Sequence, residues 1–246
     1  MNQPVSAKDY FIDTEILMMA EGFGQKSVFG IHSKSRVLIE DTEWEAAWNR
    51  LKEKGILNNQ NQISEEGSHV ISSLEQYCAS ETYARLHNLT FERPTENMPA
   101  VTMLAEQRDS ERYRVYRMTY LALLHFLFEK FPILTRTPSS EEQEFTLMKL
   151  GQEKRALLQK IEKKEQEMSL EIFDKSEVAI SANPYKRITF WSVFVYDGEL
   201  VAVDNIKSEY YKASQYWFNK LVCDILKIPY EERRVINARR NIAKPY

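Results

Sequence analysis

The feature that most constrains this fold is the spacing of apolar residues, which alternates between a helical and an extended period along the chain. In the N-terminal part, three segments have helical spacing, and each has a boundary residue that suits a helix end. Gly55 can end the second segment where positive φ is favoured, and Ser64 can cap the third. The predicted helices run from Phe11 to Glu21, from Thr42 to Gly55 and from Ser64 to Tyr77, the last two forming an αα-hairpin.

An extended pattern then replaces the helical one. Three runs alternate loosely between apolar and polar residues between turn signals, which predicts an antiparallel meander. Helical spacing returns after them and stops at Pro132, which disrupts a helix. The runs are Tyr83 to Phe91, Ala100 to Ala105 and a third around Tyr113 and Val115, and the helix spans Leu121 to Phe131.

The C-terminal half follows the same order. Pro138 to Glu142 predicts the start of a long helix, because a serine can cap it and two acids follow. Asp197-Gly198 predicts a two-residue hairpin turn, since both positions tolerate positive φ. The long helix carries Leu147, Leu150, Leu157, Leu158 and Ile161 on one face; the strands are Val178 to Ser181, Arg187 to Tyr196 and Glu199 to Asn205; the last helix is Ser208 to Lys227.

These segments predict an α+β fold in which two helix–three-strand–helix units share a central antiparallel sheet flanked by helices. We expect a quasi-twofold arrangement within a single domain, residues 1–246, with pseudo-repeat units of about 1–135 and 136–246. No repeat is visible residue by residue, so the predicted repeat is one of architecture.

Several classes of protein are excluded by the composition. The longest apolar run, Leu121 to Leu127, is far shorter than the ~20 residues that span a bilayer, so we expect no membrane insertion. The first residues lack the basic and then apolar pattern of a signal peptide. Cys78 and Cys223 are too few for a disulfide framework or a cysteine-rich zinc site. We therefore expect a cytoplasmic protein with reduced thiols.

The sequence also lacks the motifs of common enzymes. It has no Walker loop, no G-x-S-x-G elbow and no dinucleotide-binding glycine motif, and its four histidines are scattered. Asp197, Glu199 and Asp204 lie close together, but a turn and separate strand positions explain them better than acid–base catalysis. We expect no catalytic residue, no metal site, no cofactor, and a binding protein that is not an enzyme.

A winged-helix-like nucleic-acid-binding regulator is the alternative, with the αα-hairpin carrying the recognition helix. Such a helix needs Arg, Lys, Asn or Gln along one face. Residues 64–75 instead carry Glu65, Glu66 and Glu75 and no Lys or Arg, and the net charge is −3. The basic residues between Lys227 and Lys244 are compatible with nucleic acid, with an acidic partner helix or with a helix end. On balance we expect no nucleic-acid partner.

Three stretches of the sequence resemble a known family. They are Phe11-Ile-Asp-Thr-Glu-Ile-Leu, Trp48-Asn-Arg-Leu-Lys-Glu-Lys-Gly-Ile-Leu followed by Gln62-Ile-Ser-Glu-Glu-Gly, and Trp191-Ser-Val-Phe-Val-Tyr-Asp-Gly-Glu-Leu-Val. This pattern is similar to that of the EspG-like chaperones of type VII (ESX) secretion systems, and it is closer to their relatives in Firmicutes than to the mycobacterial proteins. It departs from the mycobacterial type in being shorter, with tight turns in place of long loops.

The resemblance implies a cytoplasmic chaperone that binds a helical type VII secretion substrate and keeps it soluble and export-competent. It implies no catalytic residue, because the family has none. Covering the apolar end of such a substrate requires an aromatic-rich, unreactive surface. We expect Leu89, Phe91, Met98 and Met103, near the turn of the first meander, as candidate partner-binding residues, although a core position also suits Leu89 and Phe91.

Overall fold

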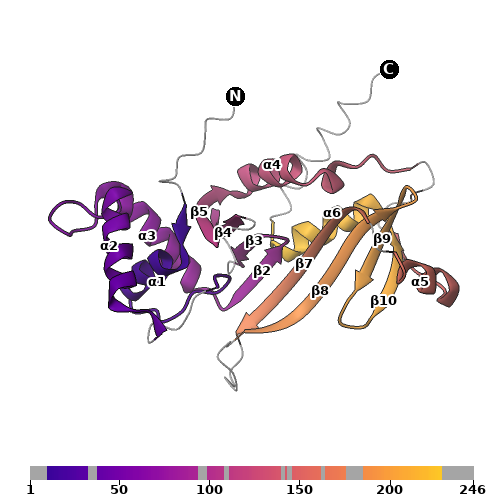
Figure 1. The fold of residues 1–246 in the computed structure, drawn as a ribbon. Coiled ribbons are helices and arrows are strands. Elements are labelled where there is room, and N and C mark those ends of the chain that lie inside the picture. The colour runs from indigo at the N-terminus through magenta and orange to yellow at the C-terminus, as the bar shows by residue number, and fades with distance from the viewer. Residues whose placement is uncertain are drawn as a thin grey trace. The chain divides into compact units, whose positions relative to one another are not determined.

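A computed structural model of the chain describes residues 10–32, 38–93, 99–107, 111–139, 142, 146–161, 164–175 and 185–228. The α-helices and strands fall into two compact units (Figure 1). The first unit comprises Met1–Ser80, Asn88–Glu92 and Val101–Arg117, and the second comprises Glu81–His87, Arg93–Ala100 and Met118–Tyr246.

The first unit combines three helices with four strands. The helices are α1 (Asp13–Glu21), α2 (Asp41–Glu53) and α3 (Glu65–Cys78). The strands lie in the order β1-β5-β4-β3, with bounds Phe11–Ile12 for β1, Leu89–Glu92 for β3, Ala100–Gln107 for β4 and Arg112–Thr119 for β5. All three predicted N-terminal helices and the strands around Ala100 and Tyr113 are confirmed.

The boundaries of α2 and α3 have the physical causes expected from the sequence. Gly55 follows α2 with φ +75°, a conformation that costs glycine little. Ser64 caps α3, and its Oγ accepts a hydrogen bond from the N–H of Gly67 at 2.8 Å. Gly67 itself lies so close to the backbone of Ile56 that an added Cβ would stand 2.2 Å from the Ile56 oxygen.

A buried carboxylate joins α1 to α2, which the apolar pattern did not predict. The side chain of Glu15 has no exposed surface, and it pairs with Lys54 Nζ and with Arg50 Nε at 2.8 Å. Glu15 also accepts a hydrogen bond from the N–H of Ile12 at 3.1 Å. These partners compensate the cost of burying the charge.

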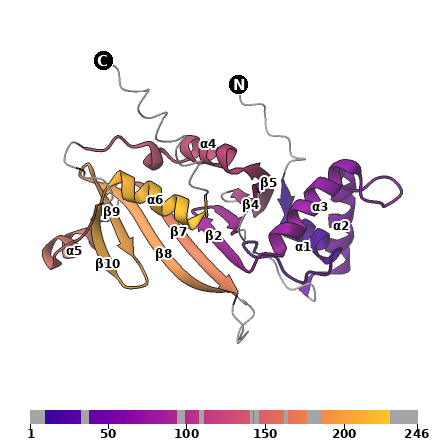
Figure 2. The same ribbon diagram turned by 180° about the vertical axis from the view of Figure 1, so that it is seen from behind.

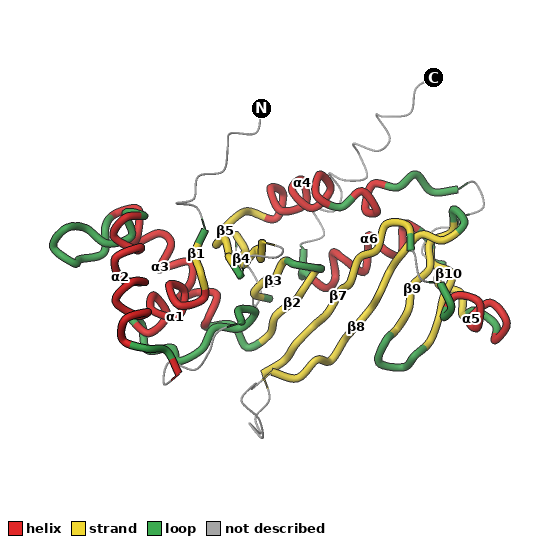
Figure 3. The backbone as a smooth tube through the Cα atoms, viewed as in Figure 1, coloured by secondary structure: helices red, strands yellow, loops and turns green. Residues whose placement is uncertain are grey.

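The second unit is dominated by six antiparallel strands of the sheet, which pair in the order β2-β7-β8-β9-β10-β6 (Figure 3). Its strands are β2 (Thr82–Leu86), β6 (Leu147–Lys149), β7 (Glu165–Lys175), β8 (Tyr185–Tyr196), β9 (Glu199–Asp204) and β10 (Glu209–Ala213). Its helices are α4 (Tyr120–Lys130), α5 (Gln152–Leu158), α6 (Gln215–Ile225) and the 3-10 helix η3 (Pro132–Thr135). Helix α6 crosses one face of the sheet (Figure 2).

The hairpin predicted at Asp197-Gly198 is confirmed. Tyr196 pairs with Glu199, and the two residues between them have φ values of +50° and +72°. Positive φ at both central positions is the requirement of a type I′ turn, whose twist matches that of the flanking strands.

The predicted long helix after Pro138 is wrong. Residues 147–149 form the edge strand β6, which pairs with β10, and only residues 152–158 form a helix, α5. Gly151 disfavours a continuous helix by about 1 kcal/mol relative to alanine, and the backbone bonds to β10 replace those of the helix. The leucines have the spacing of a helix, but pairing with β10 makes residues 147–149 a strand.

Two other element predictions also need correction. The last helix begins at Gln215 and not at Ser208, because residues 209–213 pair with β9 and Ser214 caps the helix. The run from Tyr83 to Phe91 is two strands, separated at His87, whose φ is +55°. Strand β7, which spans Glu165–Lys175, was not predicted. The predicted strand Val178 to Ser181 lies outside the described residues.

The α+β class with a large antiparallel sheet is confirmed. The quasi-twofold arrangement and the pseudo-repeat units of about 1–135 and 136–246 remain predictions.

Candidate partner-binding surface

The sheet of the second unit has one face that α6 covers and one that no described helix crosses at β7 and β8 (Figures 1 and 2). Trp191 of β8 marks the covered face, since its ring lies 5.3 Å from that of Trp217 in α6. Side chains alternate along a strand, so the neighbours of Trp191 point to the other face. We call this other face the open sheet face; it carries Arg85, Glu171, Phe173, Arg187, Phe190, Ser192 and Phe194.

Cations and aromatic rings alternate at one end of the open sheet face. The Arg187 guanidinium lies 4.6 Å from the centre of the Phe190 ring and 5.5 Å from that of Phe173. Arg85 approaches Phe173 at 5.3 Å, and Glu171 forms an ion pair with Arg187 at 2.6 Å. Each cation–π contact contributes on the order of 0.5–1 kcal/mol at such partly exposed sites. This end is therefore an ordered, amphipathic surface.

The other end of the open sheet face is apolar and carries α5. Leu158 of α5 packs on Phe194, Val201 and Val203, and half-buried side chains surround this cluster. Beside it, Met148 of β6 and Leu157 of α5 are 57% and 52% exposed. Exposed large apolar side chains next to an ordered cluster are typical of a protein-binding surface.

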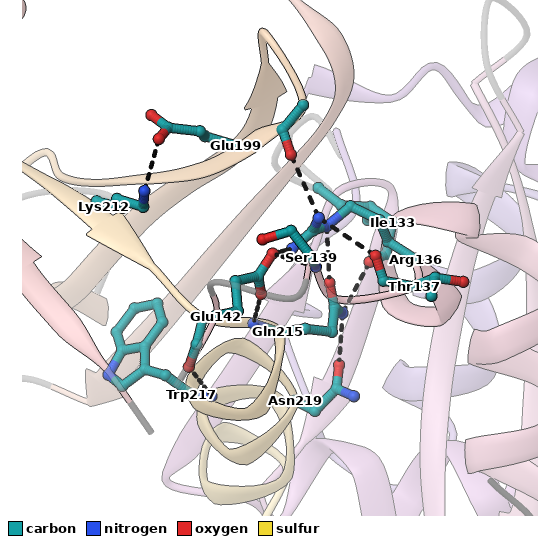
Figure 4. Close-up of polar contacts among 12 residues, drawn as sticks. Ile133, Arg136, Thr137, Ser139, Glu142, Glu199, Lys212, Gln215, Trp217 and Asn219 are labelled. Atoms are coloured by element: carbon teal, nitrogen blue, oxygen red, sulfur yellow. Dashed lines mark hydrogen bonds and ion pairs between the residues drawn. The ribbon is translucent and has the colours of Figure 1, made fainter. Parts of the chain in front are cut away.

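A polar cluster holds the segment after η3 against the start of α6 (Figure 4). Glu142 accepts hydrogen bonds from Arg136, from the N–H of Ser139 at 3.2 Å and from the N–H of Gln215 at 2.8 Å. Burial by itself raises the pKa of Glu142, but the bonds from Arg136 and the two backbone N–H groups outweigh it, and the net pKa is lowered. The cluster thus contains a stable charged pair with a structural role.

Gln215 completes this polar cluster. Its fully buried side-chain amide donates to the carbonyls of Ile133 and Leu134 at 3.0 and 3.3 Å, and its oxygen accepts from Arg136 Nε at 3.1 Å. All these contacts lie within the second unit. They hold the start of α6, the helix that covers one face of the sheet, against η3 and the residues after it.

Three of the predicted partner-binding residues are buried. Leu89 and Phe91 of β3 and Met103 of β4 have no exposed surface, and Phe91 and Met103 pair directly across the two strands. Met98 lies outside the described residues. The core position considered for Leu89 and Phe91 is thus the one that the structure shows.

The open sheet face was not predicted as a site, although part of its signal is in the sequence. Arg187 and Phe190 fall in the predicted strand Arg187 to Tyr196, but Glu171 and Phe173 belong to β7, which was not predicted. The alternation of charged and aromatic residues in both strands was the available signal, and only the register of β7 with β8 shows which residues meet.

The carboxylates weighed as a catalytic group have structural partners. Glu199 binds Lys154 at 2.5 Å and Lys212 at 2.6 Å, and these bonds lower its pKa. Asp204 accepts hydrogen bonds from the N–H groups of Ile206 and Lys207 in the β9–β10 turn. Within the described part of the chain, no group of three or more His, Cys, Asp or Glu side chains is placed to hold a metal ion.

The structure does not favour α3 as a nucleic-acid recognition helix. Glu65, Glu66 and Glu75 are exposed along it, and carboxylates repel phosphates. As for membranes, none of the helices among the described residues combines the length and the apolar character needed to cross a bilayer.

Comparison with known proteins gives one matching family model and a solved structure with a similar fold. Residues 5–234 match the family model described as a domain of unknown function (DUF5081), whereas no curated protein sequence matches the chain. Among solved structures, the chain is similar to the Mycobacterium tuberculosis type VII secretion system chaperone EspG5, determined in complex with the PE25–PPE41 dimer. The TM-score is 0.51 at 12% sequence identity, and the match covers 90% of this chain and 96% of that chain.

A similarity at 12% identity establishes the fold, and it confirms the resemblance to EspG-like chaperones that the sequence predicted. The chain belongs to the family of the domain of unknown function DUF5081, and its fold is that of an EspG-type chaperone.

Proposed function

We propose that this protein is a cytoplasmic chaperone that binds a helical substrate of a type VII secretion system and keeps it soluble and export-competent. The observation that carries the proposal is the fold similarity to EspG5, which extends over nearly the whole of both chains. That structure contains EspG5 in complex with the PE25–PPE41 dimer. The proposal gives this chain a task of the same kind, with a partner of its own.

The open sheet face supports this function as the surface for the partner. The half-buried ring of Phe190 and the exposed side chains of Met148 and Leu157 suit the apolar end of a helical protein, because large rigid aromatic groups lose little entropy on binding. The contact region predicted from the sequence, Leu89, Phe91, Met98 and Met103, is a second proposed surface. Its three buried members, Leu89, Phe91 and Met103, can contact a partner only after β3 and β4 rearrange.

Co-expression with small helical proteins encoded beside the gene tests the proposal, with size-exclusion chromatography and light scattering as the readout. We expect one of them to be insoluble alone and to co-elute with this chain in a defined stoichiometry. Separate elution of every candidate, each soluble unaided, would exclude the chaperone function. A gel shift at low salt would then test the nucleic-acid alternative.

Site variants locate the surface once a complex is found. Replacing Phe190 with alanine removes a ring from the open sheet face and should weaken the complex about tenfold or more, as expected for a central aromatic contact. Ile206→Ala is the matched control, because Ile206 is 54% exposed in the β9–β10 turn. Equal affinities for both variants would place the partner elsewhere.

A further inference from the structure

Arg187 occupies an unusual position on the open sheet face. Its guanidinium is held between the rings of Phe173 and Phe190, at 5.5 and 4.6 Å from their centres. Its Nε forms an ion pair with Glu171, whose side chain is only 9% exposed, while the Arg187 side chain is 45% exposed. Three contacts therefore fix the orientation of a side chain that still reaches solvent.

The contacts of Arg187 leave part of its donor set unused. A guanidinium has five N–H donors, one on Nε and four on the two terminal amino groups. The contact with Glu171 is an ion pair in which Oε2 of Glu171 accepts no hydrogen bond, and the terminal amino groups donate no hydrogen bond to the described residues. A fork of donors with a fixed plane is the geometry that binds a carboxylate through two parallel hydrogen bonds.

A second arginine lies at this end of the open sheet face. Arg85 lies directly opposite Glu171 in the pairing of β2 with β7, and it approaches the same Phe173 ring as Arg187. Both guanidinium groups therefore contact the Phe173 ring.

We propose that Arg187 is a specificity-determining residue that binds a carboxylate of the partner, next to apolar partner side chains that contact Phe190. The inference rests on the proposed function and assigns its partner a chemical feature: a helical segment in which Asp or Glu borders the apolar end. The stacked, ion-paired arginine loses little side-chain freedom on binding, so its contact is stronger than that of a mobile surface cation.

A carboxylate of a protein fits the surroundings better than a phosphate of nucleic acid or lipid. Phosphate polymers bind to extended fields of basic residues, whereas this chain has a net charge of −3. The guanidinium also lies between apolar rings, which match a carboxylate that is flanked by apolar side chains.

Two synthetic peptides of about 20 residues provide the probe, a length at which helices begin to form in water. They share one apolar face and differ only at the bordering positions, which are Glu in one peptide and Gln in the other. Fluorescence anisotropy should show that the full-length protein binds the Glu peptide about tenfold more tightly at low salt, which corresponds to one charge-assisted pair.

Variants assign that preference to Arg187. Arg187→Gln should remove the preference while the Gln peptide still binds, and Lys186→Gln, which loses the same charge on the next residue, should keep it. Because Arg187→Gln leaves Glu171 unpaired, the double variant Arg187→Gln/Glu171→Gln is also made; it removes both charges and should show the same loss. Arg187→Lys keeps the charge without the fork and should retain a small part of the preference.

Several results would overturn the inference: equal binding of the two peptides, binding of neither, or a preference that survives in the double variant. A preference for single-stranded oligonucleotide or anionic vesicles that depends on Arg187, without a peptide preference, would also overturn it. Co-elution tests the proposed function separately. A stable complex that is insensitive to Arg187 removes this inference alone, whereas a peptide preference without any co-eluting client removes the chaperone function and keeps the carboxylate site.

Discussion

Glu142 offers the sharpest test of how the second unit is held together. The connection between η3 and β6 contains no regular structure at this residue, yet its carboxylate joins Arg136 to the first N–H of α6, that of Gln215. The Glu142 and Arg136 side chains are 5% and 13% exposed, so solvent compensates little if the pair is broken. Glu142→Gln keeps the shape of the side chain and removes its charge.

The expected loss follows from these contacts. Breaking a buried ion pair by removing one partner costs roughly 3–5 kcal/mol, and a glutamine oxygen can retain part of one hydrogen bond. We therefore expect Glu142→Gln to lower the free energy of unfolding by about 3 kcal/mol at pH 7, or the melting temperature by about 6–12 °C for a chain of this size. The pKa of Glu142 is lowered in the folded state. Its contribution is therefore complete above the unfolded pKa and is lost as the pH falls through the folded pKa, so the difference between wild type and variant should shrink in acid.

Thermal melts and amide hydrogen exchange measure the two parts of this prediction. The N–H of Gln215, which donates to Glu142 at 2.8 Å, should exchange faster in the variant than in the wild type. Glu129→Gln is the control, since Glu129 is 69% exposed and, among the residues that the structure describes, pairs only with His125. A variant with unchanged stability and unchanged protection at Gln215 would refute the reasoning.

Three further predictions concern the first unit. Gly67→Ala should destabilise it by about 2 kcal/mol, because the added Cβ meets the Ile56 backbone, whereas Ser68→Ala on the exposed side of α3 should not; urea unfolding compares the two. Burial raises the pKa of Glu92, so its charged form destabilises the folded state. Glu92→Gln should therefore raise the melting temperature at neutral pH and lose this advantage in acid, where Glu92 of the wild type is protonated. A difference in melting temperature that is constant with pH would contradict this. Burial, with a smaller effect of the Glu92 charge, raises the pKa of Cys78 to about 12. Iodoacetamide should therefore alkylate this thiol at pH 8 on the order of a thousandfold more slowly in the native protein than in the unfolded protein, and mass spectrometry measures both rates.

Local chemistry explains the elements that were predicted correctly. Ser64 caps α3, Gly55 ends α2, and Asp197-Gly198 forms the β8–β9 turn, because each needs only its own backbone conformation and its near neighbours. The resemblance to EspG-like chaperones rested on these same signals, and the fold comparison confirmed it.

Elements that depend on distant partners were not predictable in the same way. Residues 147–149 and 209–213 have helix-compatible spacing, yet they form β6 and β10 because they pair with each other and with β9. The apolar stripe of α1 gave no sign that Glu15 is buried between Arg50 and Lys54, residues about 35 to 40 positions away.

The sequence by itself determined the α+β class, the helices with strong caps, the tight hairpin and the absence of common catalytic motifs. Only the tertiary structure decided which face of the sheet α6 covers and which residues meet on the other face. Leu89, Phe91 and Met103 are buried, while Arg187 is stacked between rings from two strands and paired with a carboxylate. The physical reason is that burial and ion pairing depend on strand register and on helix packing, and both are set by contacts between residues far apart in the chain.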